Sequence, residues 1–202
     1  MKAMMNVLIV TAGLFFLFSC TGSSRRVARI AVDKTTDISG RWNDSDAHMT
    51  AEFMVKDMLS RNWLGNFIEE NDTKPILVVG KIQNRTSEHL DATVFVREIE
   101  KELINSGEVR FVASGKERKS VRKERMEQQS YASVESAKEL ANEQAADFML
   151  TGVIVSVEDT FDGEKTVLYK VSLELVDLEN NIKVWIGNKD IKKRIHQNKY
   201  SW

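Results

Sequence analysis

The sequence predicts an α/β fold, in which a mixed sheet of about four to five strands carries helices packed on it and ends in an antiparallel meander. Residues 76–79 form a continuous apolar run, which is typical of a buried central strand. Apolar residues recur at helical spacing in 45–63 and 92–105. They alternate with mostly polar residues in 167–175 and again in 182–186, as in half-buried strands.

Ser45 is predicted to cap the first helix, which runs to about residue 63. Its buried stripe is predicted to contain Ala51, Met54, Val55, Met58 and Leu59. The central strand at 76–79 is followed by a polar stretch, 83–88, which we interpret as a loop.

The middle of the chain predicts a helix over 92–105 that ends at Gly107, a brief strand over 109–112, and an exposed charged helix over 116–129. Ser133 is suited to capping one more helix. The apolar stripe of that helix consists of Val134, Ala137, Leu140, Ala141 and Ala145.

The last third predicts a meander of three strands. A β-branched run at 148–157 is followed by the turn signal Asp162-Gly163, and 179–181 turns the chain again. In the final strand Trp185 falls on the face opposite to Ile182, Val184 and Ile186.

The N-terminus has the layout of a secretory signal, with Lys2, an apolar run over 7–18 and a small residue before Cys20. The run is shorter than the roughly 20 residues of a bilayer span. The stretch resembles a bacterial lipobox, in which Cys20 becomes the lipid-bearing N-terminus, although Phe18 is larger than usual there. The alternative is an ordinary secretory signal with an incidental cysteine.

We therefore divide the chain into a signal peptide (1–19), the lipidated cysteine with a short tether and N-terminal segment (20–45), one α/β domain (46–195) and a tail (196–202). Within the N-terminal segment, 27–32 is a candidate edge strand. Cys20 is the only cysteine, so its lipidation leaves no thiol for a disulfide, a metal site or a nucleophile. A net charge of −1 provides no global field toward nucleic acid.

No catalytic or metal-binding constellation is predicted, and no cofactor. His48, His89 and His196 are not at metal-ligand spacing, and no nucleophile elbow or glycine-rich phosphate loop is present. The paired carboxylates Glu98 and Glu102 fit a solvated helix face. An envelope enzyme remains an alternative if a polar cleft surrounds Glu158, Asp159 or His196.

The strongest charge feature is a basic stretch within 116–125. A solvated helix is the first interpretation, and a docking surface for an acidic partner is the second. Nucleic-acid binding is disfavoured, because the stretch has no interleaved aromatic residues. Its basic residues are Lys116, Arg118, Lys119, Arg122, Lys123 and Arg125.

Two polar loops next to ordered elements provide the candidate partner-binding residues: Arg41, Trp42, Asn84, Arg85 and Thr86. Trp and Arg are common interface anchors. For Asn84 a structural role remains equally open, because its side chain can hydrogen-bond the local backbone and shape the turn. Trp42 and Trp185 have the alternative of packing in the core.

The segment 76–87 (ILVVGKIQNRTS) resembles the strand-and-turn signature of the LpoB family of lipoprotein activators of penicillin-binding proteins. The resemblance continues through the predicted helix at 92–105 and the brief strand at 109–112. It then extends over 145–179 and includes the final strand at 182–185. Residues 37–44 (DISGRWND) also resemble a stretch found in the family. In all, the resemblance covers about residues 37–192, by pattern and order rather than by one decisive motif.

The resemblance implies a non-enzymatic, periplasm-facing outer-membrane lipoprotein that binds and stimulates a penicillin-binding protein, a peptidoglycan synthase, and so regulates cell-wall synthesis. It implies no small-molecule substrate. The stretch before the predicted domain is short for this family, since 20 to 25 extended residues reach at most roughly 70 to 90 Å. No partner-contact residue of the family can be matched one by one.

The alternative is a structural subunit of an envelope assembly or secretion complex related to the curli-pore lipoprotein. Such a pore needs a long amphipathic hairpin in each subunit. The only hairpin candidate, 148–192, has the pattern of sheet core.

Overall fold

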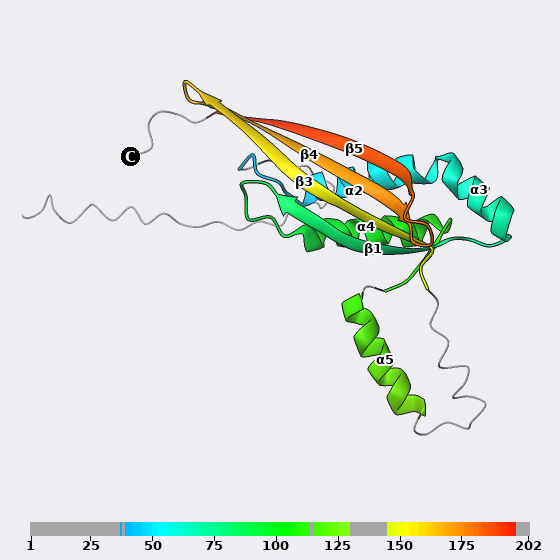
Figure 1. The fold of residues 1–202 in the computed structure, drawn as a ribbon. Helices are drawn as coiled ribbons and strands as arrows, with labels where there is room; N and C mark the ends of the chain where they lie inside the picture. The colour runs from blue at the N-terminus through cyan, green and yellow to red at the C-terminus, as the bar shows by residue number, and fades with distance from the viewer. Residues whose placement is uncertain (1–36, 38, 114, 130–144, 197–202) are drawn as a thin grey trace, which may run out of the picture. The chain divides into compact units, whose positions relative to one another are not determined.

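The computed structural model describes residues 37, 39–113, 115–129 and 145–196. They form a five-stranded mixed sheet in the order β2-β1-β3-β4-β5, with helices packed against it, which confirms the predicted fold class. Figure 1 shows α2 and α4 together on one face of this sheet. The predicted signal peptide, Cys20, the candidate strand at 27–32 and most of the helix predicted after Ser133 lie outside the described residues.

Helix α2 (Asp44–Leu59) begins two residues earlier than the sequence predicts, because Asn43 and not Ser45 is the cap. The Asn43 side chain accepts a hydrogen bond from the Asp46 backbone, and the Asp46 carboxylate accepts one from the Asn43 backbone. This reciprocal capping box satisfies two backbone donors at the helix start. The predicted stripe is otherwise confirmed, with Ala51, Met54, Val55 and Met58 buried and Leu59 packed against the core.

The prediction of a single helix to residue 63 is wrong. Helix α2 ends at Leu59, and after a short turn a second helix, α3 (Asn62–Asn71), follows. Trp63 is buried and its indole nitrogen donates to the Met58 carbonyl, so it contacts α2 across the break. Asp72 ends α3 in the left-handed conformation, which a short polar side chain tolerates.

Strand β1 (Ile76–Arg85) is longer than the apolar run that predicted it. It pairs in parallel with β2 (Arg110–Phe111) at its start and with β3 (Phe148–Phe161) along its length. The polar residues Gln83 to Arg85, interpreted from sequence as loop, therefore belong to the strand. Their backbone pairs with β3 after a register shift between Val79 and Ile82, and this pairing does not require apolar side chains.

Helix α4 (Ala92–Ser106) agrees with the prediction to within a residue, and Gly107 ends it with φ near +68°. It buries Phe95, Ile99 and Leu103 together with α2 against the sheet. The charged helix α5 (Gly115–Gln129) also forms as predicted, and its Val121 is 44% exposed.

The meander consists of β3, β4 (Glu164–Asp177) and β5 (Lys183–His196), paired antiparallel as predicted. Asp162 and Gly163 turn the first hairpin with positive φ, and Asn181 has positive φ before β5. The buried residues of β4 are those that alternate in the sequence: Val167, Tyr169, Val171, Leu173 and Leu175. In β5 the buried face is that of Trp185, whose indole donates to Asp57 of α2, while Ile186 faces outward and is 60% exposed.

Two glycines make a matched test of this packing. A Cβ on Gly152 in β3 would lie 2.3 Å from the backbone oxygen of Ser172, whereas a Cβ on Gly65 in α3 meets nothing within 4 Å. We expect Gly152→Ala to lower the free energy of unfolding by about 1–3 kcal/mol, through overpacking. We expect Gly65→Ala to raise it by up to about 1 kcal/mol, because alanine favours helix. Urea denaturation of both variants checks this, and equal midpoints would contradict the described sheet contact.

Candidate partner-binding site

Trp42 is anchored at the junction between α2 and the sheet. Its backbone N–H donates to the Tyr169 hydroxyl at 3.1 Å and to a Glu88 carboxylate oxygen at 3.3 Å. The Tyr169 hydroxyl in turn donates to the other Glu88 oxygen at 2.6 Å. The Trp42 ring lies edge-on to Phe95 and Tyr169, with ring centroids 6.0 and 5.7 Å away. Trp42 is therefore a half-buried residue that packs against the core.

Asn84 shapes the loop that follows β1. Its side-chain nitrogen donates to the carbonyls of Glu88 and Leu90, at 2.9 and 3.2 Å. Its side-chain oxygen accepts from the backbone and the hydroxyl of Thr86, at 2.9 and 2.7 Å. The nitrogen and the oxygen of the Asn84 amide thus both form hydrogen bonds within the loop. This fits the turn-shaping role that the sequence left open as the alternative to partner binding.

Arg41 and Arg85 are the exposed cations among the five candidates. Arg85 ends β1 beside Val155, and its Nε donates to Gln83. Within the described part of the chain, neither guanidinium forms an ion pair. Of the five residues, Asn84 and Thr86 build the loop, Trp42 lies against Glu88 of that loop, and the two arginines remain exposed to solvent.

The segment that carries Arg41 and Trp42 is held to β5 by Lys193, which is 8% exposed. The Lys193 ammonium donates to Asp46 at 2.5 Å, to Asp37 at 2.6 Å and to the Arg41 carbonyl at 3.0 Å. Burial lowers the pKa of Lys193, but the two carboxylates outweigh burial and leave the pKa raised. The same ammonium lowers the pKa of Asp37. This buried charge is paired, as burial requires.

Sequence reasoning missed Glu88 and Tyr169, on which the loop geometry depends. Glu88 lies in a polar stretch, and Tyr169 occupies one of the alternating buried positions of β4. One signal was available, because a buried tyrosine hydroxyl needs a hydrogen-bond partner. Which residue would supply that partner, 81 positions away, is set only by the tertiary fold.

Glu158, Asp159 and His196 were the residues around which a polar cleft would support an enzyme. Asp159 lines one surface pocket and His196 lines a different one. Glu158 is paired with Lys165 at 2.7 Å, and this hydrogen bond, with one from Ser87, lowers its pKa. His196 lies 3.4 Å from Glu164 on the surface, and Asp159 is exposed. A general acid or base needs a pKa near the working pH, and the shift of Glu158 is in the opposite direction.

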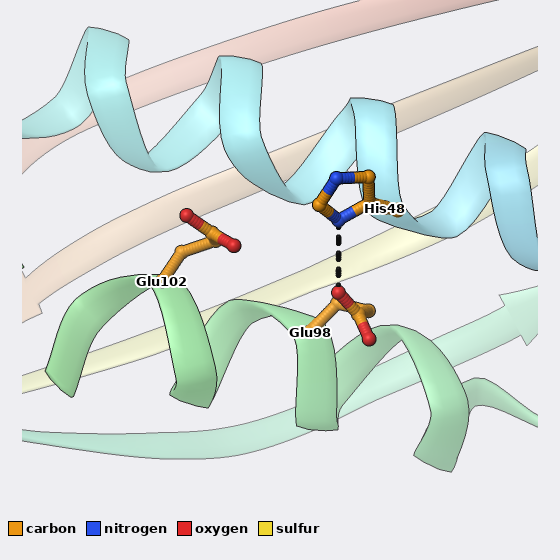
Figure 2. A group of neighbouring side chains, drawn as sticks. All are labelled: His48, Glu98 and Glu102. Atoms are coloured by element: carbon orange, nitrogen blue, oxygen red, sulfur yellow. Dashed lines mark hydrogen bonds and ion pairs between the residues drawn. The ribbon is translucent and has the colours of Figure 1, made fainter. Parts of the chain in front are cut away.

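His48 of α2 lies beside Glu98 and Glu102 of α4, as Figure 2 shows. His48 Nδ1 is 3.0 Å from a Glu98 oxygen. The Lys101 ammonium lies 2.5 Å from that same Glu98 oxygen and 3.5 Å from Glu102. The hydrogen bond from Lys101 lowers the pKa of Glu98, and so does the one from His48. Together they outweigh burial, which alone would raise that pKa. The cluster thus carries its own counter-charge and links α2 to α4 as a surface ion-pair network.

A family model described as the peptidoglycan-synthase activator LpoB matches residues 46–191 of this chain. The match spans most of the chain and nearly all of the described fold, and the chain therefore belongs to the LpoB family. This confirms the resemblance drawn from the sequence. The comparison with curated proteins found no match.

Solved structures similar to this chain include the LpoB C-terminal domain from Salmonella enterica, at 17% identity and a TM-score of 0.43, covering 72% of this chain and 98% of that one. The NMR structure of E. coli LpoB has 15% identity and a TM-score of 0.42, and covers 87% and 86%. Lipoprotein GNA1162 from Neisseria meningitidis has 13% identity and a TM-score of 0.37, covering 58% and 82%.

Removing the Tyr169 hydroxyl tests the junction. Tyr169→Phe removes the hydroxyl that donates to Glu88 and accepts from the Trp42 N–H. We therefore expect the free energy of unfolding to fall by about 1–3 kcal/mol at pH 7. Burial and the Glu88 charge raise the pKa of Tyr169 in the folded protein. The hydroxyl's contribution is therefore complete below the unfolded pKa of about 10 and is lost as pH rises through the folded pKa.

The stability difference between wild type and Tyr169→Phe should consequently narrow above pH 10 in chemical denaturation. A difference that stays constant to high pH would contradict the buried hydrogen bond to Glu88.

The neighbouring lysines of β5 make a second matched pair. Lys193→Met strands the buried Asp46 carboxylate, and we expect a loss of about 3–5 kcal/mol of stability. Lys192→Met changes an exposed neighbour and should alter stability by no more than about 0.5 kcal/mol. Urea midpoints distinguish the two, and a tolerated Lys193→Met would show that residues 37–46 are not held by this ammonium.

Proposed function

We propose that this protein is a periplasm-facing lipoprotein of the outer membrane, anchored through Cys20, that binds a penicillin-binding protein and stimulates its peptidoglycan synthesis. The observation that carries the proposal is the LpoB family match over 46–191. The family consists of activators rather than enzymes.

The described fold supports a binding role over a catalytic one. Glu98, Glu158 and Asp37 are each paired with a lysine, and the hydrogen bond from that lysine lowers the pKa of each carboxyl group. A binding protein can change the activity of an enzyme by binding one of its conformations more tightly than another. A rigid domain with a fixed surface loop suits this, because little ordering is required upon binding.

The lipid anchor is part of the same proposal. No helix among the described residues is long and apolar enough to cross a membrane. Acyl chains on Cys20 would keep the domain near the membrane and raise its effective concentration beside a synthase. Mass spectrometry of the purified protein tests this through the acylated N-terminal peptide, and a free Cys20 thiol in the membrane fraction would contradict it.

Arg41 and Arg85 are the proposed contacts. Both are exposed beside a loop that Asn84, Thr86 and Glu88 hold in one shape. A guanidinium can form two parallel hydrogen bonds with a carboxylate, so an acidic patch on the synthase is the expected counterpart.

Affinity capture tests both the partner and the contacts. The lipidated protein is immobilised and exposed to detergent-solubilised membranes, and retained penicillin-binding proteins are labelled with a fluorescent penicillin. We expect one labelled band with wild type, and affinity weakened by about tenfold in Arg85→Glu. The control is Lys56→Glu, which makes the same charge change on exposed α2 and should bind as wild type.

The outcomes separate two questions. Absence of any labelled band would contradict the function. A band retained equally by wild type and Arg85→Glu would leave the function standing but place the contact elsewhere, and α5 would then be the next surface to vary.

A further inference from the structure

Three side chains of the kinds that bind metal ions meet between α2 and α4. His48 extends from α2, and Glu98 and Glu102 extend from α4 toward that helix, as Figure 2 shows. One ligand atom from each of the three lies within 4.8 Å of the other two. His48 is 50 positions from Glu98 in the chain, so the sequence shows no metal-ligand spacing here.

The two helices hold these side chains in place. The glutamates are four residues apart on α4, a spacing that puts them on one face of a helix. Their neighbour Ile99 is fully buried, and so are Ala47 and Ala51 of α2 on either side of the histidine. The ligand residues therefore lie at the rim of a packed helix–helix contact. Side chains supported in this way need little rearrangement to bind an ion.

The cluster already holds one positive charge. The Lys101 ammonium lies 2.5 Å from Glu98 and 3.5 Å from Glu102, so both carboxylates share a single cation. The Lys101 side chain is 45% exposed, and its flexible stem can turn into solvent. Exposed ion pairs contribute little net stability, and exchange of this ammonium for another cation is therefore cheap.

The donor set and its spacing fit zinc. Four-coordinate zinc binds imidazole nitrogen and carboxylate oxygen at about 2.0–2.2 Å, which places neighbouring ligand atoms about 3.3 Å apart. His48 Nδ1 and the nearer Glu98 oxygen are already 3.0 Å apart, and rotation of the Glu102 side chain closes the remaining spacing. Calcium and magnesium prefer oxygen ligands alone, so the imidazole disfavours them.

We propose that His48, Glu98 and Glu102 bind a zinc ion, which takes the place of the Lys101 ammonium between the two carboxylates. Water completes the coordination, as is usual with three protein ligands. The ion joins α2 to α4 near the start of both helices, one turn from Phe95, whose ring contacts Trp42. This inference goes beyond the proposed function and does not depend on it.

Isothermal titration of the full-length protein in detergent with zinc chloride tests the site. Cys20 is alkylated beforehand, so that a free thiol cannot bind the ion. We expect His48→Gln and Glu102→Gln each to weaken zinc binding by at least about tenfold, since even the loss of an outer-shell partner typically has that effect. The control is His196→Gln, which removes an exposed imidazole beside the single carboxylate of Glu164 and should bind zinc as wild type.

Lys101→Met should change the affinity in the opposite direction. It removes the ammonium that competes for both carboxylates, and we expect zinc to bind about tenfold more tightly. Lys56→Met is its control, because this exposed lysine lies about 12 Å from His48 along α2, where salt screens its charge. An ion-pair network without a metal site gives no reason for tighter binding in Lys101→Met.

The zinc-bound protein should also unfold at a higher urea concentration than the metal-free protein, and His48→Gln should remove that difference. Wild type that takes up no zinc would overturn the proposal. So would equal zinc affinity in wild type and Glu102→Gln, or an affinity that Lys101→Met leaves unchanged. Calcium bound as tightly as zinc would show that the imidazole is not a ligand, and the proposal would then be wrong.

Discussion

The candidate surface depends on one buried hydroxyl. Tyr169 lies on the central strand of the meander, yet its oxygen joins the segment before α2 to the loop after β1 through Trp42 and Glu88. The partly buried Glu88 carboxylate and Trp42 backbone N–H both have partners here, and one arrangement satisfies them together. The positions of Arg41 and of the loop beside Arg85 follow from it, because each is within a few residues of an anchored atom.

The sequence predicts those parts of the fold that local patterns determine. The alternation in β4, the amphipathic helix α4 and the turn at Asp162-Gly163 each follow from a period or a turn signal. The break after Leu59 could not be seen, since Trp63 continues the apolar pattern of α2. The extension of β1 to Arg85 was also missed. Backbone pairing with β3 does not require apolar side chains, so a polar sequence gives no signal of it.

The site was predicted less completely than the fold. Polar loops drew attention to Asn84, Thr86 and Trp42, and the structure gives these residues scaffolding roles. The residues that organise them, Glu88 and Lys193, are charged side chains in polar or alternating stretches. Their partners are 81 and 147 positions away in the chain, and only the tertiary fold brings them together.

The arrangement as a whole suits a protein that acts through contact. Lys193 is neutralised by Asp37 and Asp46, whereas Arg41 and Arg85 are exposed, and the loop is fixed by hydrogen bonds on both sides of the Asn84 amide. Such a surface can favour one state of a synthase by differential affinity, without taking part in the reaction.

The most direct measurement is the rate at which a purified bifunctional synthase from the same cell polymerises its lipid-linked precursor, with and without the lipidated protein. The account predicts a saturable increase in rate that is weaker with Arg85→Glu than with Lys56→Glu. A rate unaffected by saturating wild-type protein, across the penicillin-binding proteins of that cell, would contradict it.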